Sequence, residues 1–562
     1  MEQIAHSNRR WRLAVVGVLA AFSVTLPLVA QETGQLFSKG PYVQAGGPTS
    51  MTIMWESATN APGLVRFGRG GKLTETLVVG PPRPMTGIST VYRTNVVSVR
   101  TDSLTVLRTN VVAPDATNLF YVYTATLENL KPGAAYTYAV ELDGSRTRPR
   151  QFKTFKPNTK SVRFIAYGDS RSNPDTHAAL ARRFRSHAPD FVLHTGDLVG
   201  RGRDYWLWSP EFFTPLADVM AEVPLFPAIG NHEQDGTNYF AFFHLPGNER
   251  WYSFDAGPVH VLVLDYQFAQ ATSEQFAFAR DDLMASRAPW KIVLLHCPVF
   301  NIGGHKTGWG HKDYLRLFHQ AKVDLVLAGH SHIYERFRPV AARSPGDDWP
   351  LTCITTGGGG ANLYPTFNHP ALFAQGTLYH YLVFDVTRDT LRGQAIRADG
   401  ETIDRFTWRK RNGLCAPDYL AQVYPEESLK LFYEAAPSLG GYATGVPTAE
   451  VPAKVMLKLA PRPESADPAE LEISLAPESA PYYKLENGPL RALLPPKGGT
   501  NQVVWATVRA AGQTRITEDR SHDLSPPLVF QATVKAPEGQ TITYGNKARI
   551  TQAAKEAAGV GP

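Results

Sequence analysis

Apolar side chains recur at every second position in the first third of the chain. The pattern holds within residues 51–55 and again within 136–140, as in strands with one buried face. Arg-Thr-Asn-Val-Val occurs at 93–97 and once more at 108–112. A single recurrence predicts a long β-hairpin insertion rather than a repeat architecture. We therefore expect residues 34–156 to form an N-terminal β-sandwich.

The pattern changes between residues 160 and 410. Short apolar runs of strand length alternate there with amphipathic segments of helical length. The apolar runs are 162–167, 191–193, 225–229, 259–264, 292–295 and 323–327. The amphipathic segments include 175–186, 273–286 and 312–320. This alternation predicts an α/β layered domain over 160–410.

Alternation with a period of two returns over residues 415–562. Leu471, Ile473 and Leu475 alternate with polar residues, and 503–508 and 528–534 are further strand candidates. Proline-rich joints separate these strands. The pattern predicts a β-rich C-terminal region, either a second sandwich or a loosely packed tail, and its role is not indicated.

The N-terminus has the pattern of a targeting segment. Arg9, Arg10 and Arg12 precede the apolar run 13–28, and small residues near Ala30 offer a cleavage site. A membrane anchor is the alternative, but the run is shorter than the roughly 20 residues that a span needs. We expect residues 1–30 to be a signal peptide and the protein to be periplasmic or secreted. The Arg9-Arg10 pair resembles a twin-arginine signal, although the surrounding pattern is imperfect.

Composition narrows the classes of protein that fit. The chain has 562 residues, 43% of them hydrophobic and 19% charged, which suffices for several packed domains. A formal net charge of +6 over this length does not favour nucleic acid as a partner. The cysteines Cys297, Cys353 and Cys415 allow at most one disulfide. We expect Cys297, which follows the run 292–295, to be a buried small hydrophobe. The oligomeric state is not indicated.

Residues with metal-binding chemistry follow the predicted strands of the central domain. They are Asp169, Asp197, Asn231-His232, His296 and His330-Ser-His332. In an open α/β sheet, ligands bind at the carboxyl ends of the strands, so we expect these side chains to converge on one edge. Each signal alone is weak, because a Gly-Asp is usually a turn. The ordered set of oxygen and imidazole donors predicts two divalent metal ions with one bridging carboxylate.

The segment Gly329-His-Ser-His-Ile-Tyr-Glu-Arg336, with this ordered set, resembles the calcineurin-like metallophosphoesterases, and most closely their purple acid phosphatase branch. Leu130-Lys-Pro-Gly-Ala-Ala-Tyr136 is similar to the tyrosine corner of fibronectin type III sandwiches, and such a domain precedes the catalytic domain in that branch. The resemblance covers roughly residues 38–410. It implies a fibronectin-like domain followed by a metallophosphoesterase domain.

The resemblance also implies a role for each polar residue. The implied metal ligands are Asp169, Asp197, Asn231, His296, His330 and His332. Asp197 would bridge the two ions, with Asp169 and His332 on the first and the remaining three on the second. His232 would be the acid-side histidine that faces the substrate. His305 stands where plant-type enzymes have a further substrate-facing histidine; the alternative is a loop histidine in a glycine-rich surface turn.

Two positions depart from the family pattern. Gly200 replaces the tyrosine whose phenolate on Fe(III) gives purple acid phosphatases their colour, so we expect no purple band. Arg171 replaces the histidine that most other metallophosphoesterases have two residues after the first aspartate. Arg171 suits a bidentate contact with phosphate or a salt bridge to a nearby acid. His177 is either a replacement ligand of the first ion or an ordinary residue at a helix start.

We therefore predict an exported, metal-dependent phosphoric ester hydrolase that acts on small phosphate monoesters. Its cofactors would be two divalent or trivalent ions of iron, zinc or manganese. One alternative is a phosphodiesterase that uses the same site. The other is a non-catalytic exported binding protein with a degenerate phosphatase domain. His232 and the complete second site favour an enzyme, whereas Gly200 and Arg171 favour the binding protein. After cleavage of the signal peptide, we expect no association with a membrane.

Overall fold

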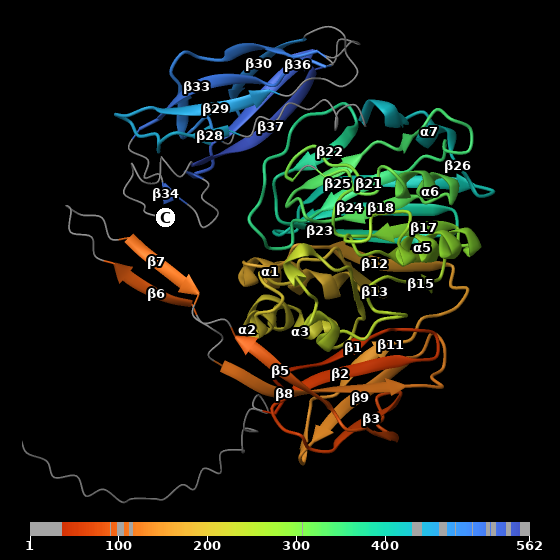
Figure 1. Ribbon diagram of the computed structural model, residues 1–562. Coiled ribbons are helices and arrows are strands. Elements are labelled where there is room, and N and C mark those ends of the chain that lie inside the picture. The colour runs from red at the N-terminus through yellow and green to blue at the C-terminus, as the bar shows by residue number, and fades with distance from the viewer. Residues whose placement is uncertain are drawn as a thin grey trace, which may run out of the picture.

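The computed structural model of the protein describes residues 36–89, 92–97, 106–111, 116–305, 307–429, 441–459, 469–477, 479–496, 498–512, 517–518, 524–535 and 541–550. Figure 1 shows a β domain, an α/β domain and a second β domain in chain order. This confirms the predicted fold class. The expected signal peptide of residues 1–30 lies outside the described residues. Across the described ranges, no helix is long and apolar enough to cross a membrane.

The N-terminal domain is a sandwich of two antiparallel sheets, with strand orders β1-β2-β8-β5 and β10-β9-β3-β4, and β11 pairs with β9. The strands are β1 (Lys39–Gln44), β2 (Met51–Ser57), β3 (Gly63–Arg69), β4 (Glu75–Val78), β5 (Arg83–Ser89), β8 (Ala116–Leu127), β9 (Ala135–Leu142), β10 (Ser145–Arg146) and β11 (Arg150–Lys153). Trp55 and Tyr123 stack in the core with ring centroids 4.9 Å apart. The Tyr136 hydroxyl accepts a hydrogen bond from the backbone N–H of Lys131 at 2.8 Å, which is the predicted tyrosine corner.

A separate two-stranded ribbon interrupts this sandwich. Its strands, β6 (Tyr92–Val97) and β7 (Val106–Val111), pair antiparallel. In Figure 1 the ribbon projects away from the two sheets. This is the hairpin that the recurring Arg-Thr-Asn-Val-Val predicts.

The central domain contains two seven-stranded sheets, and the expectation of one sheet edge is therefore wrong. The first sheet has the order β14-β13-β12-β23-β24-β25-β26, and the second β15-β16-β17-β18-β21-β19-β22. The strands of the first are β12 (Ser161–Tyr167), β13 (Phe191–His194), β14 (Leu225–Pro227), β23 (His380–Thr387), β24 (Thr390–Arg397), β25 (Thr402–Arg411) and β26 (Leu414–Cys415). Those of the second are β15 (Tyr252–Ala256), β16 (Val259–Val263), β17 (Trp290–Leu294), β18 (Leu325–Ala328), β19 (Tyr334–Phe337), β21 (Thr352–Thr356) and β22 (Leu372–Gly376).

Helices lie on both sides of these sheets (Figure 1). They are α1 (Pro174–Phe184), α2 (Tyr205–Trp208), α3 (Thr214–Met220), α4 (Tyr239–Phe242), α5 (Glu274–Ala285), α6 (Tyr314–Gln320) and α7 (Pro417–Leu420). Shorter turns are η2 (Arg185–His187), η3 (Ser209–Phe213) and η4 (Asn231–Glu233), and β20 (Val340–Ala341) pairs with β27 (Tyr424–Pro425). The segments 175–186, 273–286 and 312–320 are thus helical as predicted, with ends that differ by one or two residues.

The apolar run that forms strand β17 is uninterrupted because both faces of this strand are buried. Ile292 and Leu294 pack into the core that the second sheet shares with the first. Val293 and Leu295 belong to the core on the opposite face, which includes side chains of α5 and α6. A strand buried on both faces has no solvent-facing positions, so its sequence does not alternate.

His260 ties β16 to its neighbours. Its Nδ1 lies 2.9 Å from Asp255 of β15, and its Nε2 lies 2.8 Å from Asp282 of α5. Burial opposes the charged imidazole, but the hydrogen bonds to the two carboxylates outweigh it and raise the pKa of His260 to about 9. The ring is 6% exposed and Asp282 is 18% exposed, whereas Asp255 is 75% exposed, so the network joins a buried imidazole to one partly buried and one exposed carboxylate.

The aromatic segment 205–213 packs against the N-terminal domain. The Tyr205 hydroxyl donates to Glu56 at 2.7 Å, and Glu56 forms a buried ion pair with Lys39 at 2.7 Å. The Lys39 ammonium lies 4.0 Å from the Tyr205 ring centroid and 4.7 Å from that of Phe242. These contacts place the aromatic segment at the interface between the N-terminal and central domains.

The C-terminal domain is an eight-stranded sheet with the order β31-β33-β29-β28-β37-β36-β30-β32, and β34 pairs with β35. The strands are β28 (Gly441–Ala443), β29 (Ala453–Leu459), β30 (Ala469–Leu475), β31 (Tyr483–Leu485), β32 (Leu490–Leu494), β33 (Gln502–Ala510), β34 (Thr517–Glu518), β35 (Leu524–Ser525), β36 (Val529–Lys535) and β37 (Thr541–Ile550). Leu471 and Ile473 are buried, as their alternation predicts. The region is therefore a packed domain rather than a loose tail.

All three cysteines are free thiols. Cys297 and Cys353 are buried, and Cys415 is half-buried. Burial raises the pKa of Cys297 to about 12, which keeps this thiol protonated and unreactive. The expectation that Cys297 is a buried small hydrophobe is confirmed.

Candidate metal centre

The candidate ligands follow strands of both central sheets. Along the chain they come after β12 (Asp169), β13 (Asp197), β14 (Asn231), β17 (His296) and β18 (His330 and His332). The strands β12, β13 and β14 run parallel in one sheet, and β16, β17 and β18 run parallel in the other. The site therefore lies where the carboxyl ends of the two sheets meet.

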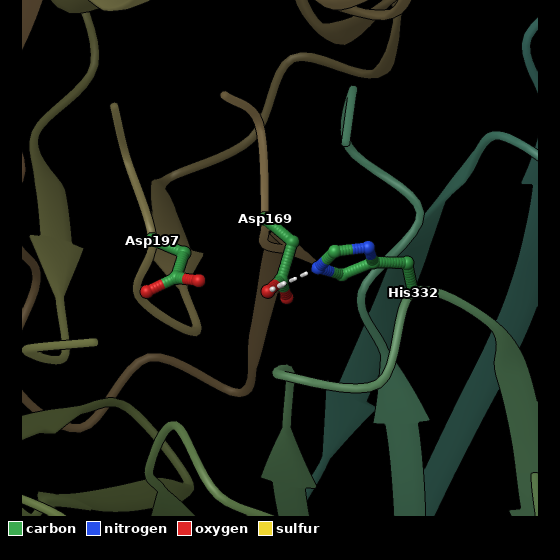
Figure 2. A group of neighbouring side chains, drawn as sticks. All are labelled: Asp169, Asp197 and His332. Atoms are coloured by element: carbon green, nitrogen blue, oxygen red, sulfur yellow. Dashed lines mark ion pairs between the residues drawn. The ribbon is translucent and has the colours of Figure 1, made fainter. Parts of the chain in front are cut away.

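Asp169, Asp197 and His332 form one group of buried donors (Figure 2). One ligand atom from each lies within 4.8 Å of the others. The Nδ1–H of His332 donates to the carbonyl oxygen of Asn362 at 2.6 Å, so Nε2 carries a lone pair. That nitrogen lies 3.5 Å from Asp169 Oδ1. His332 Nε2 and Asp169 Oδ1 are both electron-pair donors, so this arrangement favours a cation between them.

Asn231, His296 and His330 form a second group. The Nδ1–H of His296 donates to the carbonyl oxygen of Thr195 at 2.8 Å, and its Nε2 faces the other two residues. This Nε2 lies 2.9 Å from Asn231 Oδ1, and His330 Nδ1 lies 2.9 Å from the same oxygen. Burial lowers the pKa of His330 to about 3, so its ring is neutral. One amide oxygen and two imidazole nitrogens thus converge, and this donor set fits a metal ion.

Asp197 lies between the two groups. Its Oδ1 is 3.3 Å from His296 Nε2 and accepts the backbone N–H of His232 at 2.9 Å. Its Oδ2 faces the guanidinium of Arg171, with Nε 3.4 Å away. Burial alone would raise the pKa of Asp197, but His296, His232 and Arg171 outweigh it and hold this pKa well below its usual range. Asp197 is therefore an anion that lies beside both groups, as a bridging ligand requires.

Close backbone packing explains the glycines beside these ligands. A Cβ at Gly230 would overlap Asp197 Oδ1, and one at Gly329 would overlap Asp169 Oδ2. Asp169, Asp197 and His330 themselves have left-handed backbone, with φ of 56°, 57° and 66°. Non-glycine residues adopt this conformation at an energetic cost, which is typical of functional sites.

Two family models match the chain in the regions just described. They are Calcineurin-like phosphoesterase over residues 162–334 and Purple acid Phosphatase, N-terminal domain, over 39–154. The chain is a calcineurin-like metallophosphoesterase with a purple acid phosphatase N-terminal domain. The family implies metal ions, and the buried donors Asp169, Asp197 and His332 fit one.

This metallophosphoesterase has relatives among the acid phosphatases. Acid phosphatase type 7 of Mus musculus is 30% identical over 255 residues, which cover 39% of this chain and 58% of the relative. Purple acid phosphatase 21 of Arabidopsis thaliana is 30% identical over 256 residues, 41% of this chain and 56% of the relative. The chain thus spans less than two thirds of these relatives. The structure of a purple acid phosphatase from yellow lupin (Lupinus luteus) seeds has the same fold, with a TM-score of 0.52 at 20% identity over 65% of this chain and 73% of that one.

His232 lies at the solvent side of the metallophosphoesterase centre. Its Nδ1 is hydrogen-bonded to the carbonyl oxygen of Gly200, and its Nε2 lies 3.8 Å from Asp197 Oδ2. The side chain is 29% exposed, whereas Asp169, Asp197, His296 and His332 are buried. Burial lowers the pKa of His232, and the negative charge of Asp197 opposes that shift. His232 is therefore partly exposed beside the candidate bridging carboxylate.

His305 is exposed, and its ring centroid lies 5.1 Å from that of His330. Its Nε2 lies 2.8 Å from the hydroxyl of Tyr364, whose ring stacks on His332 with centroids 4.6 Å apart. Tyr364 also lines a cavity of about 530 Å³ that the C-terminal domain borders through Pro477 and Pro527. Sequence analysis missed Tyr364, because its loop carries no pattern that links it to the histidines.

Glu233 is the second residue that sequence analysis left without a role. Its buried carboxylate accepts backbone N–H groups of Asp197 at 2.9 Å, Leu198 at 2.8 Å and Gly230 at 2.7 Å. It thereby joins the loop after β13 to the loop after β14. The available signal was its position directly after Asn231-His232.

The structure does not bring His177 to the other candidate ligands. Its Nε2 lies 2.9 Å from the hydroxyl of Tyr167, and its Nδ1 lies 2.8 Å from the carbonyl oxygen of Glu211. Burial lowers the pKa of His177 to about 4, so the ring is neutral. Both nitrogens are committed to the core, which favours the structural one of its two predicted roles. The side chain of the same Glu211 accepts a hydrogen bond from the backbone N–H of Gly200 at 2.6 Å.

Proposed function

We propose that this metallophosphoesterase hydrolyses small phosphate monoesters and that it uses two metal ions. The observation that carries the proposal is that Asp197 lies beside both groups of donors: one of its carboxylate oxygens lies within 4.8 Å of donor atoms of Asp169 and His332, and its Oδ1 lies 3.3 Å from His296 Nε2. The residues that would hold the ions are Asp169, Asp197, Asn231, His296, His330 and His332. Mixed carboxylate, amide and imidazole donors suit iron, zinc or manganese. Held by these residues, such ions would supply Lewis-acid charge for hydrolysis of a phosphate ester by water.

Three further side chains would act on the substrate. Arg171 presents a planar guanidinium that matches two phosphoryl oxygens and offsets their charge. His232 is positioned to deliver a proton from Nε2 to the leaving alkoxide, a contribution of about 10²–10⁴-fold in rate. His305, held by Tyr364, would donate to the phosphate from the other side. The export signal expected in residues 1–30 supports action in the periplasm or outside the cell.

The test compares p-nitrophenyl phosphate with bis-p-nitrophenyl phosphate after chelation and re-addition of Zn²⁺, Mn²⁺ or Fe²⁺. We expect restored turnover of the monoester and its loss in Asp197→Asn. Asp324→Asn is the matched control, because Asp324 is an equally buried carboxylate, paired with Lys410 at 2.6 Å. This control loses stability but should retain turnover.

Each outcome distinguishes the alternatives. Faster turnover of the diester would favour a phosphodiesterase. Absence of turnover with every metal would overturn the catalytic proposal and favour a non-catalytic phosphate-binding protein. Equal loss of activity in Asp324→Asn would show that destabilisation, rather than loss of the bridging carboxylate, causes the effect.

A further inference from the structure

The guanidinium of Arg171 contacts two candidate ligands of the first metal ion. Its Nε lies 3.4 Å from Asp197 Oδ2, and its Nη2 lies 3.3 Å from His332 Nε2. The Arg171 side chain is 16% exposed, and the two partners are almost fully buried. Arg171 therefore reaches inward from the solvent side to the floor of the site.

The contact with His332 uses the lone pair that a metal ion would need. Because the Nδ1–H of His332 donates to Asn362, Nε2 is its only acceptor atom. One lone pair cannot accept a hydrogen bond from Arg171 and ligate a metal ion at the same time. Binding of an ion by Asp169, Asp197 and His332 therefore requires Arg171 to move away from Nε2.

Charge acts in the same direction. Arginine stays protonated, and a cation at hydrogen-bond distance from a metal ligand repels a divalent ion at that ligand. The second group differs, because Asn231, His296 and His330 face one another across distances of 2.9–3.2 Å. The two groups share Asp197, but the guanidinium contacts the group that contains His332.

We infer that Arg171 competes for Asp197 and His332 with the metal ion of the site that contains Asp169 and His332. This site is therefore the weaker of the two, and it fills after the site of Asn231, His296 and His330. Entry of the weaker ion displaces the guanidinium, which becomes available to a phosphate anion. Occupancy of the weaker site and binding of phosphate are thereby coupled through one side chain. The inference rests on the proposed function only in that both require a metal centre.

The test measures Zn²⁺ binding to the full-length, chelated protein by titration calorimetry, with metal content checked after dialysis. We expect wild type to bind one equivalent tightly and a second at least about ten-fold more weakly. Arg171→Gln, which removes the guanidinium and its charge but keeps a polar side chain, should bind the second equivalent about ten-fold more tightly than wild type. Arg171→Lys keeps the charge and should retain the weak second site. Arg203→Gln is the control, since Arg203 is exposed and pairs with Asp235.

Tight binding of one equivalent of Zn²⁺ at the site of Asn231, His296 and His330 shows that a variant is folded, because Arg171 is not among the ligands of that site. The inference is overturned if wild type binds two equivalents with equal affinity, or if Arg171→Gln leaves the second equivalent unchanged. A second readout is inorganic phosphate: with both ions bound, Arg171→Gln should bind it more weakly than wild type. Because Zn²⁺ binding is measured without substrate, failure of this inference and failure of ester hydrolysis are separate results.

Discussion

Replacement of Glu233 by glutamine tests how the protein holds the metal ligands in place. The carboxylate is fully buried and accepts three backbone N–H groups, two on Oε2 and one on Oε1. Glutamine keeps one acceptor oxygen and turns an NH₂ group toward the remaining N–H. In Glu233→Gln one buried N–H donor therefore loses its acceptor and faces another donor.

The structure sets the size of the effect. An unsatisfied buried donor costs about 1–3 kcal/mol in the free energy of unfolding. The three N–H groups belong to Asp197, Leu198 and Gly230, so the strain falls on the bridging ligand and on the residue before Asn231. Loss of an interaction that orients metal ligands typically lowers metal affinity by about 10–100-fold. We expect both effects in Glu233→Gln.

Glu335 provides a matched control. It is also fully buried and accepts two backbone N–H groups, from Ile302 at 2.9 Å and Gly303 at 2.8 Å, one on each oxygen. Glu335→Gln likewise leaves one N–H without an acceptor, but on the loop that carries His305. We expect a similar loss of stability with Zn²⁺ affinity close to wild type.

The assay is Zn²⁺ titration of the two variants and wild type, together with thermal unfolding of the chelated proteins. The reasoning is refuted if Glu233→Gln binds Zn²⁺ as tightly as wild type. Equal loss of affinity in Glu335→Gln would also refute it, because the effect would then follow stability and not the position of Asp197.

Three further perturbations test other parts of the structure. Gly329→Ala places a methyl group against the Asp169 carboxylate, where it cannot fit without strain. We therefore expect the Zn²⁺ content after dialysis to fall by about one equivalent, and an unchanged content would contradict this. Tyr364→Phe removes the hydroxyl that holds His305, so KM for p-nitrophenyl phosphate should rise a few-fold, about the value of one hydrogen bond, while Zn²⁺ affinity stays constant. His260→Gln should lower the free energy of unfolding by about 2 kcal/mol near pH 6 and by little at pH 10. The sign follows because a pKa raised to about 9 gives stabilisation that is complete below the ordinary value of about 6.5 and is lost as pH rises through 9; a pH-independent difference would contradict it.

Local patterns in the sequence predicted the elements well. The apolar run 292–295 predicted a buried strand, because a strand that is covered on both faces must be apolar at each position. The Tyr136 corner and the paired ribbon of 92–97 and 106–111 followed in the same way, since each depends on residues close together in the chain. The ordered set of Asp, Asn and His residues also indicated the metal centre, because strand ends are local features.

The boundaries of helices were predicted less well than their existence. Helix α5 ends one residue inside each end of the predicted segment 273–286. Ser273 caps it by accepting the backbone N–H of Phe276, an interaction that amphipathic periodicity does not encode.

The sequence by itself determined the class of each domain and the donor atoms available for metal ions. Only the tertiary structure decided that these donors come from two sheets, that Arg171 contacts His332, and that Tyr364 holds His305. The reason is physical: Arg171 and His332 lie 161 positions apart, and Tyr364 lies 59 positions from His305. Such contacts depend on how whole sheets and loops pack, whereas periodicity reports only the burial of each segment.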